Sequence, residues 1–143
     1  MIVLDTNVIS ELMHPRGEPR VVAWADELQT GEVYLTAITT AELRYRVARL
    51  PDGRRKADLA DRIQRTLDED FTGRILSFDD NAAAHYADIV THRERRGSPI
   101  STADAQIAAI CRSHRAGLAT RNTKDFADTG IDVIEPWNST PAA

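Results

Sequence analysis

Short apolar segments alternate with amphipathic segments along the whole chain, and this alternation restricts the fold more than any other feature of the sequence. The expected strands are residues 1–4, 33–36, 74–78, 118–120 and 133–134. The expected helices are residues 7–13, a segment that begins at 19, 40–50, a longer segment around 59–67, 80–95 and 102–115. Strands that alternate with helices predict an α/β fold, with a mostly parallel sheet covered on both faces.

Length and composition predict one soluble domain. The chain has 143 residues, of which 42% are hydrophobic and 28% are charged, a balance that supports a single core. No apolar run is long enough to cross a bilayer, and no basic and apolar leader precedes the first strand. We therefore expect a cytoplasmic protein without membrane contacts. The single cysteine, Cys111, is expected to be a small buried residue.

The charge distribution leaves the class of ligand open. A net charge of −4 argues against a protein that coats DNA nonspecifically, but it permits an enzyme that binds nucleic acid through metal ions and a few arginines. Arginines cluster in residues 44–55 and 93–96. Arginine suits bidentate phosphate contacts, although a codon bias would produce the same excess over lysine.

Four acidic residues occupy the positions where ligands bind in parallel α/β proteins. They are Asp5, Glu42, Asp104 and Asp125, and each follows or opens an expected strand or helix. In an open α/β sheet, helix starts and strand carboxyl ends share one edge, which is where ligands bind. We therefore expect the four carboxylates to converge there.

Helix capping is the alternative explanation for these acids. Thr39 with Glu42, and Ser101 with Asp104, fit the pattern of a hydroxyl that caps a helix and an acid three positions later. Asp5 could cap the first helix in the same way. The positions of two of these acids on their helices favour a buried site instead. Asp104 shares a helix face with Ile100, Ile107 and Cys111, and Glu42 aligns with Ile38 and Tyr45.

Converging carboxylates require a cation. Two unit charges about 5 Å apart repel by roughly 3 kcal/mol at an effective dielectric constant of about 20. Oxygen-only ligands select hard divalent ions, Mg²⁺ or Mn²⁺ rather than Zn²⁺. The four histidines form no His-x-x-x-His or Cys/His cluster, so a zinc site is not expected.

Several motifs together resemble a known family. The motifs are IVLDTNVISE at 2–11, TAEL at 40–43, STADAQIAA at 101–109, ATRNTKDF at 119–126 and PW at 136–137. They are similar to those of PIN-domain proteins and, more narrowly, to toxins of VapBC-type toxin–antitoxin pairs in the FitB-like branch. The resemblance covers the whole chain, with the motifs in the same order.

The resemblance implies a fold and an activity. The fold would be a single PIN-like domain, an α/β/α sandwich with a five-stranded parallel sheet over residues 1–137, followed by a flexible tail at 138–143. The activity would be that of a metal-dependent endoribonuclease toxin that cuts a structured RNA such as tRNA. Such toxins are usually homodimers, and a small antitoxin that also binds operator DNA holds them inactive.

The resemblance also assigns roles to the acids. Asp5 and Asp104 would be the principal ligands of Mg²⁺, with Mn²⁺ as a possible substitute. Glu42 and Asp125 would complete the acidic site and could also bind metal. One of these two carboxylates would orient the attacking water.

Uncharged residues within the motifs, Asn122 among them, would support the site. Thr6 and Asn7 match the opening motif of the family, and Thr120 matches the threonine at the end of a strand. Many relatives place an acid two residues after that threonine, where this chain has Asn122. Asp125 lies three residues further on, so either Asp125 or Asn122 would fill the fourth position of the site.

The roles of two basic residues are undecided, and two other functions are alternatives. Arg121 and Lys124 could contact phosphate, or they could belong to a solvated turn. The chain could act mainly as a corepressor subunit whose acidic groove captures an antitoxin arginine. It could also be a deoxyribonuclease or another metal-dependent phosphoesterase, since related acidic sites serve flap nucleases.

Overall fold

A parallel sheet forms the centre of the protein in the computed structural model, which describes residues 1–138. Within that range the sheet has five strands in the order β3-β2-β1-β4-β5, and every pairing is parallel. The strands are β1 (Ile2–Leu4), β2 (Val33–Thr36), β3 (Ile75–Leu76), β4 (Gly117–Ala119) and β5 (Val133–Ile134). The predicted α/β sandwich is confirmed, and the sheet is wholly rather than mostly parallel.

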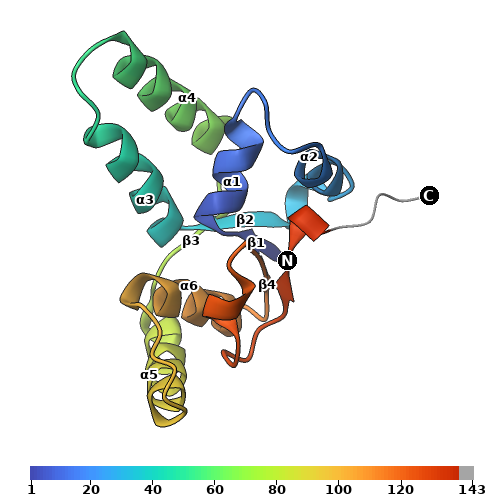
Figure 1. Cartoon of the computed structure of the whole chain (residues 1–143), viewed down its shortest axis with the longest axis vertical. Helices are drawn as coiled ribbons and strands as arrows, with labels where there is room; N and C mark the ends of the chain where they lie inside the picture. The colour runs from blue at the N-terminus through green and yellow to red at the C-terminus, as the bar shows by residue number, and fades with distance from the viewer. Residues whose placement is uncertain (139–143) are drawn as a thin grey trace.

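Helices cover both faces of this sheet (Figure 1). The α-helices of the described residues are α1 (Thr6–Met13), α2 (Pro19–Asp26), α3 (Ala37–Ala48), α4 (Arg54–Asp70), α5 (Asp80–Arg95) and α6 (Thr102–Ser113). Helices α1 to α4 lie over one face, where α3 and α4 form a projecting hairpin, and α5 and α6 lie over the other. None of the helices in residues 1–138 is long and apolar enough to cross a membrane.

Three short 3₁₀-helices lie in the connections of the described chain. They are η1 (Thr30–Glu32), η2 (Thr123–Phe126) and η3 (Pro136–Asn138). Asn138, which was expected to open the flexible tail, ends η3. The rest of that predicted tail, 139–143, lies outside the residues that the structure describes.

Alternation along the central strands divides the core into two layers. Val3 and Leu118 pack with α5 and α6, whereas Leu4 and Ala119 pack with α1 to α4. Successive side chains of a strand point to opposite faces, so the apolar run of β1 contributes to both layers. This arrangement places β1 at the centre of the sheet and fixes the end of β1, at Asp5, between the two helical layers.

Helix α3 differs from its predicted form in two respects. It begins at Ala37 instead of residue 40, because the Thr36 hydroxyl accepts a hydrogen bond from the backbone N–H of Thr39 and so caps the helix. The alternative explanation, in which Thr39 and Glu42 form a capping pair at this helix, is therefore wrong. Tyr45 is also not on a buried face with Glu42, because it is 65% exposed and lies beneath the guanidinium of Arg49.

Candidate active site

The carboxyl ends of three neighbouring strands carry the polar residues of the site. Strand β1 lies between β2 and β4, so the three strands end side by side. Asp5 follows β1, Thr36 ends β2 and Thr120 follows β4. All three side chains are buried, although each is polar. Burial of polar groups at one edge requires that they satisfy one another through hydrogen bonds.

Asp5 is the most buried acid of the four, with 5% of its surface exposed. Its Oδ1 accepts a hydrogen bond from the backbone N–H of Thr6 at 2.8 Å, so Asp5 does cap α1. Its Oδ2 accepts from the Thr120 hydroxyl at 2.7 Å and from the Asn7 amide at 3.4 Å. A carboxylate has about four acceptor positions, so capping leaves Asp5 able to bind a cation as well.

Glu42 is joined to this centre through a hydroxyl. The Thr6 Oγ1 donates to Glu42 Oε2 at 2.9 Å, which connects α1 to the second turn of α3. Thr39 lies next to this contact and is fully buried, with its hydroxyl 3.4 Å from that of Thr36 and 3.5 Å from that of Thr6. These hydroxyls hold the start of α3 against α1, and with it the carboxylate of Glu42.

Thr120 connects the fourth strand to the same network. Its hydroxyl donates to Asp5 and accepts from the backbone N–H of Asn122 at 3.0 Å. Asn7, in α1, contacts the segment after β4 as well, because its Oδ1 accepts from the backbone N–H of Arg121 at 3.1 Å. Asn122 therefore contributes through its backbone, and its side chain is exposed.

Asp104 lies in the first turn of α6, partly buried and facing the same edge. Ser101 caps the helix by accepting from the backbone N–H of Asp104 at 3.2 Å, so the predicted capping serine is present. Burial raises the pKa of the Asp104 carboxyl above its usual value, and the charges of Asp5, Asp125 and Glu42 raise it further. The four predicted acids therefore lie close enough for their charges to interact.

Asp125 reaches the site from η2. Its side chain is exposed, while the next residue, Phe126, is 1% exposed and packs into the core beneath the turn. The prediction that Phe126 anchors this turn is confirmed. Further along the turn, the Thr129 hydroxyl donates to the Phe126 carbonyl at 2.6 Å.

The basic residues of the sequence have separate locations. Arg121 and Lys124 are exposed at the rim of the site, and the Arg121 guanidinium lies 5.0 Å from the centre of the Trp137 ring. Arg93, in contrast, is 7% exposed and binds backbone carbonyls. It is therefore not available to contact phosphate, although the arginine cluster at 93–96 had left such a role open.

Sequence reasoning missed the roles of three residues that organise this edge. Thr36 and Thr39 supply buried hydroxyls, and Arg93 contacts the carbonyl of Asp125. A polar residue at the end of an apolar strand was the signal for Asp5, and the same signal was present at Thr36. Nothing in the sequence distinguished Arg93 from its exposed neighbours.

The donor set fits a hard divalent ion that keeps part of its water shell. Among residues 1–138, no three acidic, histidine or cysteine side chains are close enough to hold an ion together. Mg²⁺ needs no such cage, because it is commonly bound by one or two carboxylates together with several waters. The acids offer only oxygen ligands, whereas burial raises the pKa of the Cys111 thiol to about 12 and keeps it protonated. The buried cysteine predicted from the sequence is confirmed.

Comparison with known proteins identifies relatives along the full length of the chain. The family model described as PIN domain matches residues 2–131. The toxin FitB of Neisseria gonorrhoeae is 46% identical over 138 residues, which cover 96% of this chain and 99% of that protein. The VapC ribonuclease Y4jK of Sinorhizobium fredii is 42% identical over 137 residues, which cover 96% of this chain and 98% of that protein.

A solved structure shares the same fold. It is described as the structure of FitAB bound to IR36 DNA fragment, and its matching chain superposes with a TM-score of 0.92 at 44% identity. The match covers 98% of each chain. The arrangement of strands and helices described above is therefore that of this solved structure.

The raised pKa of Asp104 predicts how this residue affects stability without metal. The folded state holds the proton of Asp104 more tightly than the unfolded state, so this contribution to the free energy of unfolding falls as pH rises from about 4. We expect Asp104→Asn to raise the melting temperature of chelator-treated protein at pH 7, on the order of 2–4 °C. The gain should disappear towards pH 3.

The control is Asp58→Asn, which changes an exposed acid on α4. This variant should melt at the temperature of the parent throughout the pH range. A clear loss of stability in Asp104→Asn would contradict the prediction, because it would mean that the carboxylate acts chiefly at the amino end of α6.

Proposed function

The chain belongs to the PIN-domain family, among its VapC-type ribonuclease toxins, and we propose that it hydrolyses RNA at the site formed by Asp5, Glu42, Asp104 and Asp125. One observation carries this assignment. Four acids from four separate segments lie at the carboxyl edge of one parallel sheet, where burial and, after it, the charges of the other three acids raise the pKa of Asp104. Such crowding is unfavourable unless a cation is bound.

Divalent metal ions complete the site, as is general for PIN-domain nucleases. We assign Asp5 and Asp104 as the principal ligands and Mg²⁺ as the resident ion, with Mn²⁺ able to replace it. Glu42 and Asp125 complete the acidic set. When bound, such ions polarise the phosphodiester, lower the pKa of a water and neutralise charge on the leaving oxygen.

The protein contributes orientation and charge to the reaction. The hydrogen bond from Thr6 leaves the second oxygen of Glu42 free to orient the attacking water, and the exposed Asp125 faces the same site from η2. Asp5 is held by donors from α1 and from the end of β4, so its carboxylate cannot rotate away. We assign no nucleophile to the protein, since Cys111 is buried and protonated.

A protein partner follows from the family. We propose that a small antitoxin inhibits this chain and that the pair contacts operator DNA only through the antitoxin. The net charge of −4 and the acidic edge suit a cationic partner better than direct DNA contact. A homodimer in the cytoplasm is the assembly we propose, and sedimentation of the purified protein as a single species of one-chain mass would contradict it.

Purified protein should cleave RNA when Mg²⁺ or Mn²⁺ is supplied, and a chelator should stop the cleavage. Asp5→Asn and Asp104→Asn should each lower the rate by roughly 100-fold, because each removes a charged ligand while preserving the shape of the side chain. The assay uses labelled tRNA and a linear RNA, with gel analysis of the products.

Two controls define the reaction. Asp58→Asn should cleave like the parent, and DNA of the same sequence should stay intact. Full activity of both ligand variants would contradict the assignment of the site, and preferential cleavage of DNA would favour a deoxyribonuclease.

The turn after β4 allows a second test, because Asn122 and Asp125 differ in charge. Asp125→Asn should raise the metal concentration needed for cleavage about 10-fold or more. Asn122→Ala should have a milder effect, since the variant keeps the backbone N–H that binds Thr120. A nearly normal Asp125→Asn enzyme beside an inactive Asn122→Ala enzyme would show that the fourth ligand is residue 122.

Expression of the chain in bacteria should arrest growth, because uncontrolled cleavage of RNA stops translation. Asp5→Ala should remove the arrest, and so should co-expression of an antitoxin encoded beside this chain. Colony counts after induction, with protein levels matched by immunoblot, measure the effect. Arrest that persists at equal levels of Asp5→Ala would mean that the toxicity does not depend on this site.

A further inference from the structure

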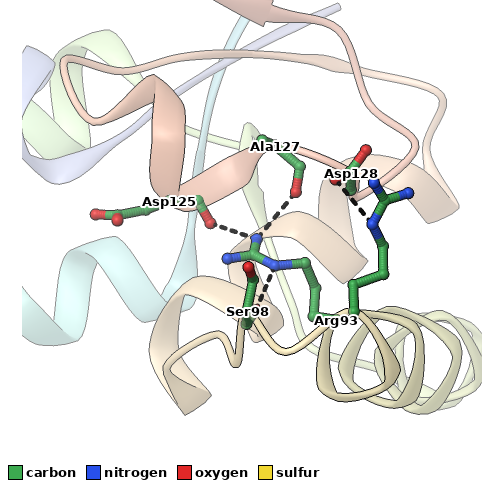
Figure 2. Close-up of polar contacts among 6 residues, drawn as sticks. Arg93, Ser98, Asp125, Ala127 and Asp128 are labelled. Carbon is green, nitrogen blue, oxygen red and sulfur yellow. Dashed lines mark hydrogen bonds and ion pairs between the residues drawn. The ribbon is translucent and has the colours of Figure 1, made fainter.

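The buried guanidinium of Arg93 connects two segments of the site (Figure 2). Its Nε donates to the Ser98 carbonyl at 2.7 Å. Its Nη1 donates to the carbonyls of Asp125 and Ala127, both at 2.9 Å. Ser98 belongs to the loop that leads into α6 and Asp104, whereas Asp125 and Ala127 belong to η2 and the residue after it.

The acceptors of Arg93 are informative because all of them are backbone carbonyls. A cation that served only to neutralise the acidic site would pair with a carboxylate. Here the carboxylate of Asp125 points away from Arg93, on the opposite side of its own backbone (Figure 2). The guanidinium therefore fixes the backbone at Asp125 and leaves the charge of the side chain available for the site.

The Asp125 side chain is restrained mainly through its own backbone. Among the described residues, its carboxylate accepts no hydrogen bond, and the residue is exposed in a short 3₁₀-helix. Phe126 anchors the turn from below, but an apolar contact does not fix the direction of the neighbouring side chain. The two bonds from Arg93 Nη1, together with the bond from the Asp125 N–H to the Asn122 carbonyl, restrain the backbone from which this side chain extends.

An ion pair on the surface provides a comparison. Arg96, three residues further along the chain, lies 3.5 Å from Asp128 in the same turn, with both side chains about half exposed. Exposed ion pairs of this kind restrain a backbone weakly, because water competes for both partners. Arg93 and Arg96 thus reach the same turn, one through buried carbonyls and the other through an exposed side chain.

We propose that Arg93 is a positioning residue that places Asp125 relative to Asp104 for binding of the divalent ion. The proposal rests on the function proposed above. A lysine at this position keeps the charge but lacks the planar fork that reaches both segments. Loss of the fork therefore affects metal binding through Asp125, while contacts to RNA at the exposed rim are retained.

The test compares Arg93→Lys and Arg93→Gln with the parent and with Arg96→Gln. Calorimetric titration with Mn²⁺ measures the dissociation constant of the ion on the purified protein, without RNA. Both Arg93 variants should bind Mn²⁺ about 10-fold more weakly, whereas Arg96→Gln should stay within about twofold of the parent. In cleavage assays at saturating Mn²⁺, the KM for RNA should not change.

A double variant separates positioning from a general loss of structure. If Arg93 acts through Asp125, adding Arg93→Lys to Asp125→Asn should change the Mn²⁺ dissociation constant by less than about twofold. The same 10-fold loss in both backgrounds would overturn the proposal, because it would show that Arg93 acts independently of Asp125.

Three further outcomes are informative. If neither Arg93 variant folds, as judged by circular dichroism and melting, Arg93 serves the fold alone and the proposal fails. If Arg93→Lys binds Mn²⁺ like the parent, only this proposal fails. Absence of Mn²⁺ binding by the parent would instead contradict the proposed function and overturn both.

Discussion

Burial of carboxylates beside one another at the carboxyl edge of the sheet is the constraint on which the other features of this site depend. Asp5 is nearly fully buried there, and Asp104 has a raised pKa because of burial and of the neighbouring acids. Apolar residues in the same space would give a more stable fold, since they would carry no electrostatic cost of burial. The arrangement becomes favourable when a divalent ion that binds only the folded state is present.

Uncharged donors make the arrangement tolerable before any ion binds. Hydroxyls of Thr6 and Thr120 donate to Glu42 and Asp5, so each of these two acids has a partner from another segment of the chain. These bonds connect α1, α3 and the end of β4, which are also the elements that enclose the core. The network that orients the acids is therefore part of what joins the sheet to its helices, and Arg93 extends the same principle to the turn of Asp125.

The sequence was sufficient for the architecture and for the convergence of the acids, because both follow from periodicity and from the positions of strand ends. It was insufficient where tertiary contacts decide. Thr39 resembled a helix cap, yet Thr36 caps α3 because the helix begins at the end of β2. Arg93 looked like its exposed neighbours, and only the fold shows that carbonyls from two loops surround it. Tyr45 was expected to be buried beside Glu42 and is exposed.

The position of the bound ion would test most directly whether Asp5 and Asp104 bind it. Crystals of the protein grown with Mn²⁺ and measured near the manganese absorption edge would give an anomalous difference map. We predict a peak within ligand distance of the carboxylates of both Asp5 and Asp104, about 2.0–2.3 Å from their oxygens. A map with no peak at this edge, from protein that cleaves RNA in the same Mn²⁺ buffer, would contradict this prediction.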